Sequence, residues 1–521
     1  MSKELKTLTR QEVAAHNTAK SAWIIVDSIV YDITNFAAMH PGGEQIILEV
    51  AGKDATEAFY SFHRHEVLSK YKRLVIGSIV NEKPKITMGT GDLSKVPYAE
   101  ESYLQGFYSP YYTDSHRRFH AAVRKFVDEV IRPDAVANDD AGKAGPIDLY
   151  RKMGEVGHLA ARIGPGEHLK AFNLLGGVKA EEFDYFHEII AHQELSRLGT
   201  HGYSESLASG MVIGLPPVIH FGSKQVKDRV VGEVLRGEKR ICLAITEPHV
   251  GSDVAGIKTT ATKTPDGKFY IVNGLKKWIT NGVFADYFST AVRTGDGPGG
   301  ISMLLVERGP GLETRSIKTS SSSASSTAYV TMENVKVPVE NLLGREGMGF
   351  QVIMYNFNHE RWVMIGAIIR ACRYVVEECF KWAHQRKVFG KKLIEQPVIR
   401  NKLAHMLTFG NVQIAEVEAV QNWFENITYQ MNKMSYKEQS QKLAGPIALL
   451  KLQSTRVAHN VSDNACQIFG GRGITKTGMG RIIETFQRTY KFSAILGGSE
   501  EIMADLGVRQ AMKFFPADAR L

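Results

Sequence analysis

Apolar residues recur at helical spacing in the segment that follows residue 110. Phe119, Val123, Phe126 and Val130 lie three or four positions apart, ahead of a proline. This spacing places them on one face of an α-helix, and similar patterns continue to about residue 237. The pattern therefore predicts a helical domain over residues 106–238.

The next part of the chain changes to a strand-like pattern. Residues 268–272 and 329–332 alternate β-branched or aromatic with polar positions, and Asn-Gly at 273–274 marks a turn. Alternation with period two is typical of strands with one buried face. We predict a β-barrel or β-sandwich domain over residues 239–345, in which the serine-rich run 320–326 forms a flexible loop.

Long helical patterns return after residue 349. They cover residues 363–380, 399–427 and 440–468 and predict a C-terminal helical bundle over 346–521.

The first part of the chain has a different character. Two short strand-like runs, residues 22–26 and 29–33, are separated by a turn and predict a compact mixed domain over residues 1–82. Residues 83–105 show no period and predict a linker. The whole chain is therefore predicted to be a multidomain α+β protein.

Length and composition agree with several domains. A chain of 521 residues is too long for a single core, and 43% hydrophobic with 23% charged residues is ordinary for a globular protein. No run approaches the roughly 18 apolar residues of a spanning helix, and the start has no secretory segment. We expect a soluble intracellular protein without a membrane span. The four cysteines have no paired metal spacing and are predicted to be buried: Cys242, Cys372, Cys379 and Cys466.

The chain is basic, with a formal net charge of +9. Such a charge suits nucleic acid, a membrane surface or a phosphate-rich ligand such as coenzyme A. The lysines and arginines are scattered rather than massed in a tail, which favours a solvated basic surface, and no nucleic-acid partner is expected. The final tripeptide, Ala-Arg-Leu at 519–521, fits a peroxisomal address, so we predict the peroxisomal matrix, or otherwise the cytoplasm.

A haem motif stands in the first domain. His-Pro-Gly-Gly at residues 40–43 is followed by His63, and this combination resembles cytochrome b5. The resemblance implies haem b held between the imidazoles of His40 and His63, with His65 as a competitor for the second position. Two axial histidines saturate the iron, so such a haem carries electrons and does not activate small molecules.

Two segments of the β domain carry the second resemblance. Ile-Thr-Glu-Pro-His-Val-Gly-Ser-Asp at 245–253 and Trp-Ile-Thr-Asn-Gly at 278–282 resemble the flavin-binding segments of the acyl-CoA dehydrogenase family. The likeness runs from about residue 111 to the end and includes the helical, β and helical order. It implies bound FAD, with Ser252 also near the acyl-CoA substrate. The implied flavin contacts are Thr246, Ser252, Trp278 and Thr280.

Two later segments, 385–391 and 467–473, resemble those by which a neighbouring subunit of that family holds the FAD diphosphate. Binding across subunits requires an oligomer, so a homodimer or homotetramer is expected. Pro397 and Arg472 depart from residues that often contact the cofactor, and Gln396 is a substitute for the first. The implied contacts are Arg386, Phe389, Gln467, Gly470 and Gly471.

The family reaction needs a carboxylate that takes the proton beside the thioester. Most members supply a glutamate near the C-terminus, but the corresponding run at 495–502 has Gly497 there. Isovaleryl-CoA and long-chain acyl-CoA dehydrogenases place the base before an arginine on an earlier helix, and Asn-His-Glu-Arg-Trp at 358–362 matches that site. The resemblance therefore assigns Glu360 as base. Burial would lift its pKa from about 4.3 toward about 6 or 7, where it abstracts protons efficiently.

The neighbouring residues receive supporting roles from the same resemblance. Arg361 would order the site and fix the substrate, and the Gly497 amide would donate to the thioester oxygen. Ser499 keeps a hydroxyl beside the flavin, where the family usually has threonine.

The main functional prediction is FAD-dependent dehydrogenation of an acyl-CoA to trans-2-enoyl-CoA, as in fatty acid β-oxidation. Electrons would pass to or through the fused haem, to an external acceptor, or to O2. The alternatives are an acyl-CoA oxidase, a nitroalkane oxidase-like enzyme and a DNA-associated flavoprotein. A nitroalkane oxidase uses an aspartate base, and residues 496–501 contain no aspartate; a dense basic tail for DNA is missing as well.

Overall fold

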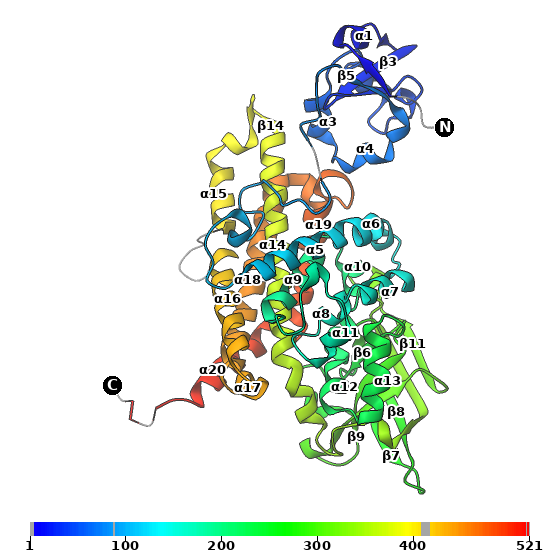
Figure 1. Ribbon diagram of the computed structural model, residues 1–521, viewed down its shortest axis with the longest axis vertical. Helices are drawn as coiled ribbons and strands as arrows, with labels where there is room; N and C mark the ends of the chain where they lie inside the picture. Colours follow the sequence, from blue (N-terminus) through cyan, green and yellow to red (C-terminus); the bar gives the residue numbers. More distant parts are fainter. Residues whose placement is uncertain (1–4, 87–88, 408–416, 517, 520–521) are drawn as a thin grey trace.

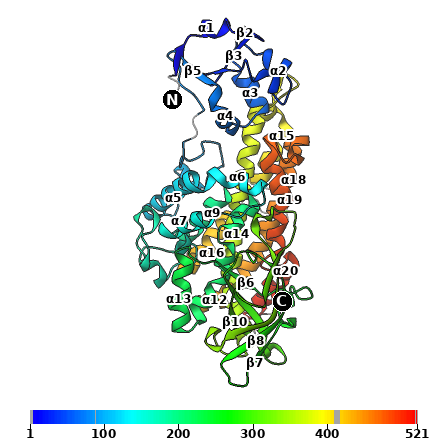
Figure 2. The ribbon, with the colours of Figure 1, turned by 90° about the vertical axis from the view of Figure 1, so that its right-hand side faces the viewer.

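The computed structural model describes all residues except 1–4, 87–88, 408–416, 517 and 520–521. A small N-terminal domain stands at one end of an elongated body (Figures 1 and 2). In the described part, no helix combines the length and the apolar character needed to cross a membrane. The C-terminal tripeptide lies mostly outside the described residues, so the peroxisomal address stays a prediction.

From residue 5 onward, where the described residues begin, the N-terminal domain is a five-stranded sheet with four short α-helices. The strand order is β1-β5-β4-β3-β2, antiparallel except for the β1–β5 pair. Thr9 and Glu12 form a capping box that starts the first helix. The strands are β1 (Lys6–Leu8), β2 (Asn17–Thr18), β3 (Ser21–Val26), β4 (Ile29–Asp32) and β5 (Val75–Ile79). The helices are α1 (Arg10–Ala14), α2 (Glu44–Leu48), α3 (Thr56–Phe62) and α4 (Glu66–Lys70).

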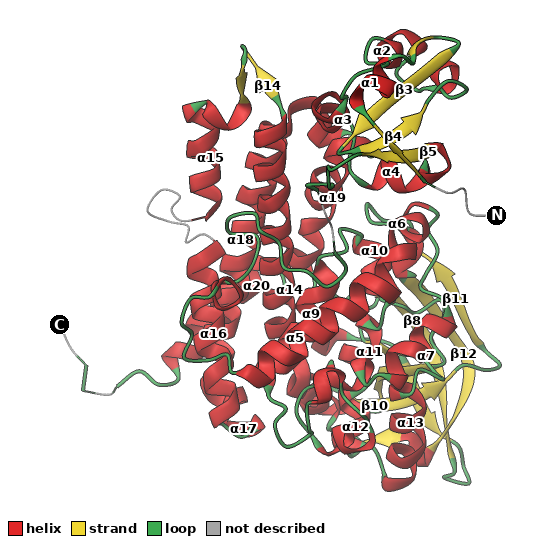
Figure 3. Cartoon of the chain, turned by 45° about the horizontal axis from the view of Figure 1, so that its top comes forward, coloured by secondary structure: helices red, strands yellow, loops and turns green. Residues whose placement is uncertain are grey.

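The body begins with the predicted helical domain, whose helices cover the inner side of the following sheet (Figure 3). Its long helices are α5 (Asp114–Phe126) and α9 (Tyr185–Ser196), which pack against each other. The shorter ones are α6 (Arg132–Asp140), α7 (Ile147–Glu155), α8 (His158–Ala161), α10 (His201–Ser206), α11 (Ser209–Gly214), α12 (Pro216–Phe221) and α13 (Lys224–Leu235).

The β domain forms one sheet of eight strands. The order is β11-β12-β8-β7-β9-β10-β13, and β6 pairs in parallel with β9. The strands are β6 (Ile241–Ala244), β7 (Thr260–Lys263), β8 (Phe269–Ile279), β9 (Tyr287–Arg293), β10 (Ile301–Glu307), β11 (Leu312–Ser316), β12 (Ala328–Pro338) and β13 (Leu342–Leu343). The serine-rich run differs from its prediction: Ser321, Ser325 and Ser326 are buried, and Ser320 accepts a bond from Arg488 of the bundle.

The C-terminal bundle is built around α14 (Gly349–Gln385), which runs the length of the body (Figure 1). A small hairpin follows it, formed by β14 (Lys387–Val388) and β15 (Lys391–Lys392). The remaining helices are α15 (Pro397–Leu407), α16 (Val417–Lys433), α17 (Tyr436–Lys442), α18 (Ala444–Phe469), α19 (Arg481–Ile495) and α20 (Glu500–Met512). Part of the predicted pattern over 399–427 lies outside the described residues.

The second half of the predicted linker is packed into the body. Glu100 is buried and pairs with Arg124 of α5 at 2.7 Å and with Arg370 of α14 at 3.0 Å. Arg124 also pairs with Glu194 of α9 at 2.9 Å. Burial by itself would raise the pKa of Glu100, but the charges of Arg370 and Arg124 outweigh it and lower the pKa to about 2. These buried charges therefore fasten three helices and the linker together.

We expect Arg124→Met to destabilise the body by about 3–5 kcal/mol, because it leaves two buried carboxylates without their shared partner. Urea unfolding followed by circular dichroism measures the loss. The matched control is Arg117→Met on the same helix, whose exposed pair with Asp114 should be worth less than about 1 kcal/mol. Equal stability of the two variants would contradict this role of the network.

Candidate functional site

Two histidines of the N-terminal domain face each other across a gap. His40 follows a short 3-10 turn and His63 ends α3, and their ring centroids lie 5.9 Å apart. Each Nδ1 is 3.1 Å from a backbone carbonyl, of Gly43 and Phe59 respectively, so Nδ1–H donates and each Nε2 is left with its lone pair. Two imidazoles whose centroids are this far apart could hold one metal ion between them, because metal–nitrogen bonds are about 2 Å long.

The surroundings of this pair suit a flat apolar group. Phe59 stacks on His63 at 4.8 Å, and Phe36 meets His40 edge-on at 6.0 Å. Burial lowers the pKa of His63, which favours the neutral imidazole that a metal requires. Met39, Ile46 and Phe62 near the two histidines are exposed apolar side chains. These residues fit haem.

The competitor His65 is engaged elsewhere. Its Nδ1 lies 2.8 Å from the Tyr60 hydroxyl, and its ring is parallel to the Tyr60 ring. The structure therefore brings His63, and not His65, opposite His40.

Glu360 lies on α14 with its carboxyl buried in the body. It is 8% exposed, and Asn356 Nδ2 donates to its Oε1 at 3.0 Å. Burial raises the pKa of this carboxyl to about 7, although Asn356 and the neighbouring Arg361 act in the opposite direction. Within the described part of the chain, Glu360 forms no ion pair within 4 Å. A buried carboxyl near neutrality is suited to exchange a proton.

The turn that holds Gly497 is fastened next to Glu360. Arg361 Nε donates to the Gly497 carbonyl at 2.9 Å, and Lys451 Nζ donates to the Gly498 carbonyl. Gly497 has φ 66°, and a Cβ there would lie 2.9 Å from the Met364 sulfur. Arg361 therefore connects the predicted base, Glu360, to the turn of Gly497. By the resemblance, most members of the family have their glutamate base at the position of Gly497. Lys451, which sequence reasoning did not single out, completes this clamp.

The two segments that carry the predicted flavin-ring residues meet at the end of strand β8. The Lys277 N–H donates to the Thr246 carbonyl at 2.8 Å, which sets the loop after β6 beside the end of β8. Trp278 is 46% exposed and has φ 65°, and Thr280 lies two positions further along the chain. Ser252 lies exposed on the same loop as Thr246. A half-exposed indole beside hydroxyl groups fits one face of an aromatic cofactor.

A buried ion pair shapes this loop. Lys276 Nζ lies 2.8 Å from Glu247 Oε1, which also accepts the Thr259 hydroxyl at 2.6 Å. Burial lowers the pKa of Lys276 to about 8, against the effect of Glu247. From the sequence, Glu247 was expected only as part of the run 245–253. In the structure its carboxylate bonds this loop to Lys276 and Thr259 of the sheet region.

The predicted diphosphate residues lie at another part of the body. Arg386 and Phe389 belong to the β14–β15 hairpin, and Phe389 is 95% exposed with φ 50°. Gly470 and Gly471 end α18, where a Cβ would meet no atom within 4 Å, and Gln467 is exposed one turn earlier. Burial lowers the pKa of Arg472, and the charge of Arg386 lowers it further. Neither arginine has an ion-pair partner among the described residues, so this surface suits an anion.

The two groups of predicted FAD residues do not meet within one chain. The β14 hairpin stands at the end of the body next to the N-terminal domain, whereas β8 lies toward the opposite end (Figures 1 and 2). Ser499 lies apart from the hairpin as well, at the start of α20, where its hydroxyl accepts from the Ile502 N–H at 3.5 Å. A cofactor that contacts both groups therefore needs a second copy of the chain.

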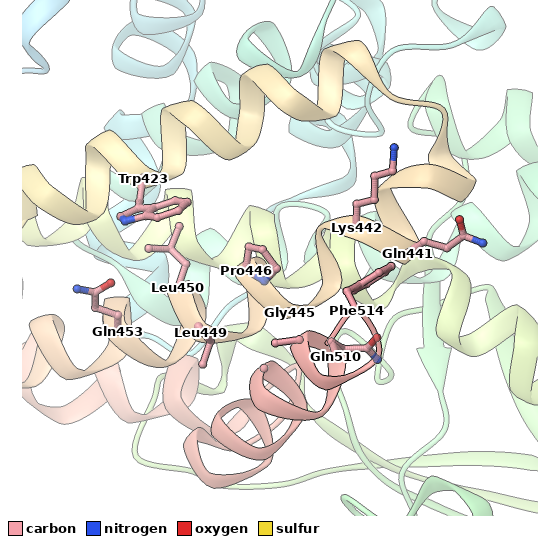
Figure 4. A pocket seen from close by; sticks show the side chains of 12 residues that line it. Trp423, Gln441, Lys442, Gly445, Pro446, Leu449, Leu450, Gln453, Gln510 and Phe514 are labelled. Atoms are coloured by element: carbon pink, nitrogen blue, oxygen red, sulfur yellow. The ribbon is translucent and has the colours of Figure 1, made fainter. Parts of the chain in front are cut away.

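Two other features do not belong to this site. An apolar groove of about 360 Å³ lies between α16, α18 and α20, lined by Trp423, Leu449 and Phe514 among others, and contains none of the predicted residues (Figure 4).

His116, Asp184 and His187 are close enough to hold a metal ion. However, they form the capping boxes that start α5 and α9, which accounts for their arrangement.

Comparison with known proteins gives matches over most of the chain. Residues 9–80 match the cytochrome b5-like haem/steroid binding domain. Residues 113–238, 242–335 and 347–512 match the N-terminal, middle and C-terminal domains of acyl-CoA dehydrogenase.

Individual proteins agree with these domain matches. The acyl-CoA dehydrogenase apdG of Emericella nidulans is 41% identical, over 82% of this chain and 98% of that protein. The acyl-CoA dehydrogenase AFT10-1 of Alternaria alternata is 35% identical, over 81% and 96%. The crystal structure of an acyl-CoA dehydrogenase from Geobacillus kaustophilus superposes with a TM-score of 0.67 at 29% identity, over 78% of this chain and all of that one.

Proposed function

The chain belongs to the acyl-CoA dehydrogenase family and carries a cytochrome b5-like domain, and from this premise we propose that it desaturates an acyl-CoA thioester and passes the electrons to its own haem. As an oxidoreductase of this family it binds FAD, and the b5-like domain binds haem. The specific proposals are the base, the acceptor and the assembly.

The observation that carries the proposal is the Glu360 carboxyl. It is buried, lacks an ion-pair partner in the described part of the chain, and has a pKa of about 7. Such a carboxylate can take the proton from the carbon beside the thioester at neutral pH. Bound FAD supplies the acceptor for the hydride from the next carbon. The Arg361 clamp on the Gly497 carbonyl keeps the turn next to the base in place.

The FAD residues support a homo-oligomer as the working form. We assign the ring to Thr246, Trp278 and Thr280 of one chain, with Ser252 and Ser499 at the edges. The diphosphate would be held by Arg386, Phe389, Gln467, Gly470 and Gly471 of a second copy. A second copy would cover the exposed Phe389 and the Arg386 guanidinium, which has no ion-pair partner in the part of the chain that the structure describes.

The haem domain supports transfer of single electrons. His40 and His63 would hold the haem iron from its two sides, and a haem held by two histidines would carry electrons and not activate oxygen or substrate. Each dehydrogenation releases two electrons and one haem would accept only one at a time, so an external acceptor that takes both electrons in successive steps is needed to complete the turnover.

Anaerobic stopped-flow mixing of the holoenzyme with acyl-CoA thioesters of different chain length tests this function. We expect flavin bleaching followed by the spectrum of reduced haem. Flavin bleaching without haem reduction would reject the internal transfer. Rapid peroxide formation in air, with the haem still oxidised, would favour an acyl-CoA oxidase instead.

We expect flavin reduction to depend on pH through Glu360. The carboxyl accepts a proton only when it is ionised, so the rate should fall about tenfold per pH unit below about 7 and level off above it. The measurement is the single-turnover rate of flavin bleaching between pH 5.5 and 8.5 with saturating acyl-CoA. A rate that is flat across this range, or that falls as pH rises, would contradict Glu360 as base.

A further inference from the structure

The segment after His63 fastens the haem domain to the dehydrogenase body. Arg64 Nη1 pairs with Glu378 of α14 and lies 3.4 Å from the Met479 carbonyl, which precedes α19. The Arg64 side chain is 17% exposed and that of Glu378 is 6% exposed. Figures 1 and 2 show the helices α3 and α4, which flank Arg64, on the side of the haem domain that faces the body.

The electrostatics of this contact favour a lasting ion pair. Burial by itself would raise the pKa of Glu378, but the charge of Arg64, assisted by Lys381, lowers it. Glu378 is therefore ionised, and it is buried in the body with a cation that the other domain supplies. A buried pair of this kind is screened little by salt, and removal of one partner leaves an uncompensated charge.

A second contact lies at the edge of the same interface. Lys387 of the β14–β15 hairpin is 2.7 Å from Glu57 of α3, and both side chains are exposed. The hairpin that carries Arg386 and Phe389 is thus in direct contact with the domain that carries the haem histidines. An exposed pair adds little binding energy but fixes orientation.

The connection between the domains is anchored on both sides. The Asp27 carboxylate accepts the N–H groups of Lys85 and Ile86 at 2.8 Å each, which ties the start of the connection to the haem domain. On the other side, the Ser94 hydroxyl donates to Glu377 Oε1 at 2.7 Å, on the same turn of α14 as Glu378. A short connection that is anchored at the docking point makes the Arg64 contact intramolecular, with a high effective concentration.

We propose that Arg64 is a positioning residue that docks the haem domain on Glu378 in one orientation, with the His63 loop against α14 and the flavin-binding hairpin. The evidence for docking is the set of contacts between the N-terminal domain and the body. Only the identity of the bound groups, haem and FAD, rests on the proposed function. Arg64 is bonded to the body and not to the haem histidines, so its role is to orient the loop and not to bind the iron.

Zero-length cross-linking of the full chain with a carbodiimide measures the docking. The reagent condenses the Lys387 amine with the Glu57 carboxylate into an amide, with loss of water, only while the two lie in contact. We expect the yield of this cross-linked peptide, measured by mass spectrometry, to fall at least about tenfold in Arg64→Glu and in Glu378→Arg. The double variant, which exchanges the charges, should recover most of the yield.

Small-angle scattering should show larger dimensions for the two single variants than for the double variant.

The control is Arg73→Glu, an exposed arginine of the same domain without an ion pair among the described residues. It should leave the cross-link unchanged. Because Glu378→Arg lies outside the haem domain, it tests the contact even when Arg64→Glu impairs folding of that domain. An unchanged cross-link in Glu378→Arg, or no recovery in the double variant, would overturn the proposal.

The haem spectrum and the haem reduction rate separate this proposal from the proposed function. A released domain with an unchanged haem spectrum supports docking by Arg64. If the single variants release the domain while the wild-type haem is never reduced by acyl-CoA, the docking holds and the internal electron transfer fails.

Discussion

Glu360→Gln should reduce the rate of flavin reduction by acyl-CoA by about 100- to 10,000-fold, the range that a positioned general base contributes. Glutamine keeps the volume of the side chain and an oxygen for the bond from Asn356, so the fold and the substrate affinity should change little. An amide cannot accept the proton. The measurement is single-turnover flavin bleaching, with substrate binding followed separately by the flavin spectral shift.

Glu500→Gln is the matched control for this variant. Glu500 lies in the run that usually supplies the family's base, but its carboxylate accepts from Thr455 at 2.8 Å and lies 3.4 Å from Arg456. We expect the rate of flavin reduction in Glu500→Gln to change by at most about threefold. The Glu500 carboxylate already has these two partners, and they account for it as a structural residue. A large loss in Glu500→Gln with a small one in Glu360→Gln would move the base to the C-terminal run.

Local patterns were enough to predict the order of the domains, and a local motif drew attention to His40 and His63. The helical spacing around Phe119, the alternation in residues 268–272 and the His-Pro-Gly-Gly motif each depend on neighbours within a few positions. The structure contains the helical, β and helical order, and His40 faces His63 as expected. The family resemblance led to Glu360, whose burial agrees with the expected rise of its pKa.

Features that depend on distant partners were not predictable. Arg64 and Glu378 are 314 positions apart, and no period in the sequence connects them. Glu100 was expected in a linker, because its segment shows no period, and Ser325 in a flexible loop, because its segment is a short serine-rich run. Each is buried, since its polar groups find partners in other segments: Glu100 accepts from Arg124, and the Ser325 carbonyl accepts from Asn281. Trp278 and Phe389 also have a left-handed backbone with positive φ. Tryptophan and phenylalanine rarely adopt this conformation, so the residue types offered no reason to expect it there.

His63→Ala should lower the affinity of the N-terminal domain for haem by more than about 100-fold, beyond the 10- to 100-fold that loss of a supporting partner costs. The variant removes one of the two imidazoles that would hold the haem iron, together with its bond to the Phe59 carbonyl, and alanine offers no replacement. The measurement is haem titration of the full chain, followed by the loss of the low-spin spectrum. His65→Ala is the matched control: its ring is hydrogen-bonded to the Tyr60 hydroxyl and packs parallel to the Tyr60 ring, so haem affinity should stay within about threefold of wild type. His63→Ala should still reduce its flavin with acyl-CoA at the normal rate, because Glu360 belongs to the other part of the chain. Retained low-spin haem in His63→Ala together with its loss in His65→Ala would transfer the axial role to His65.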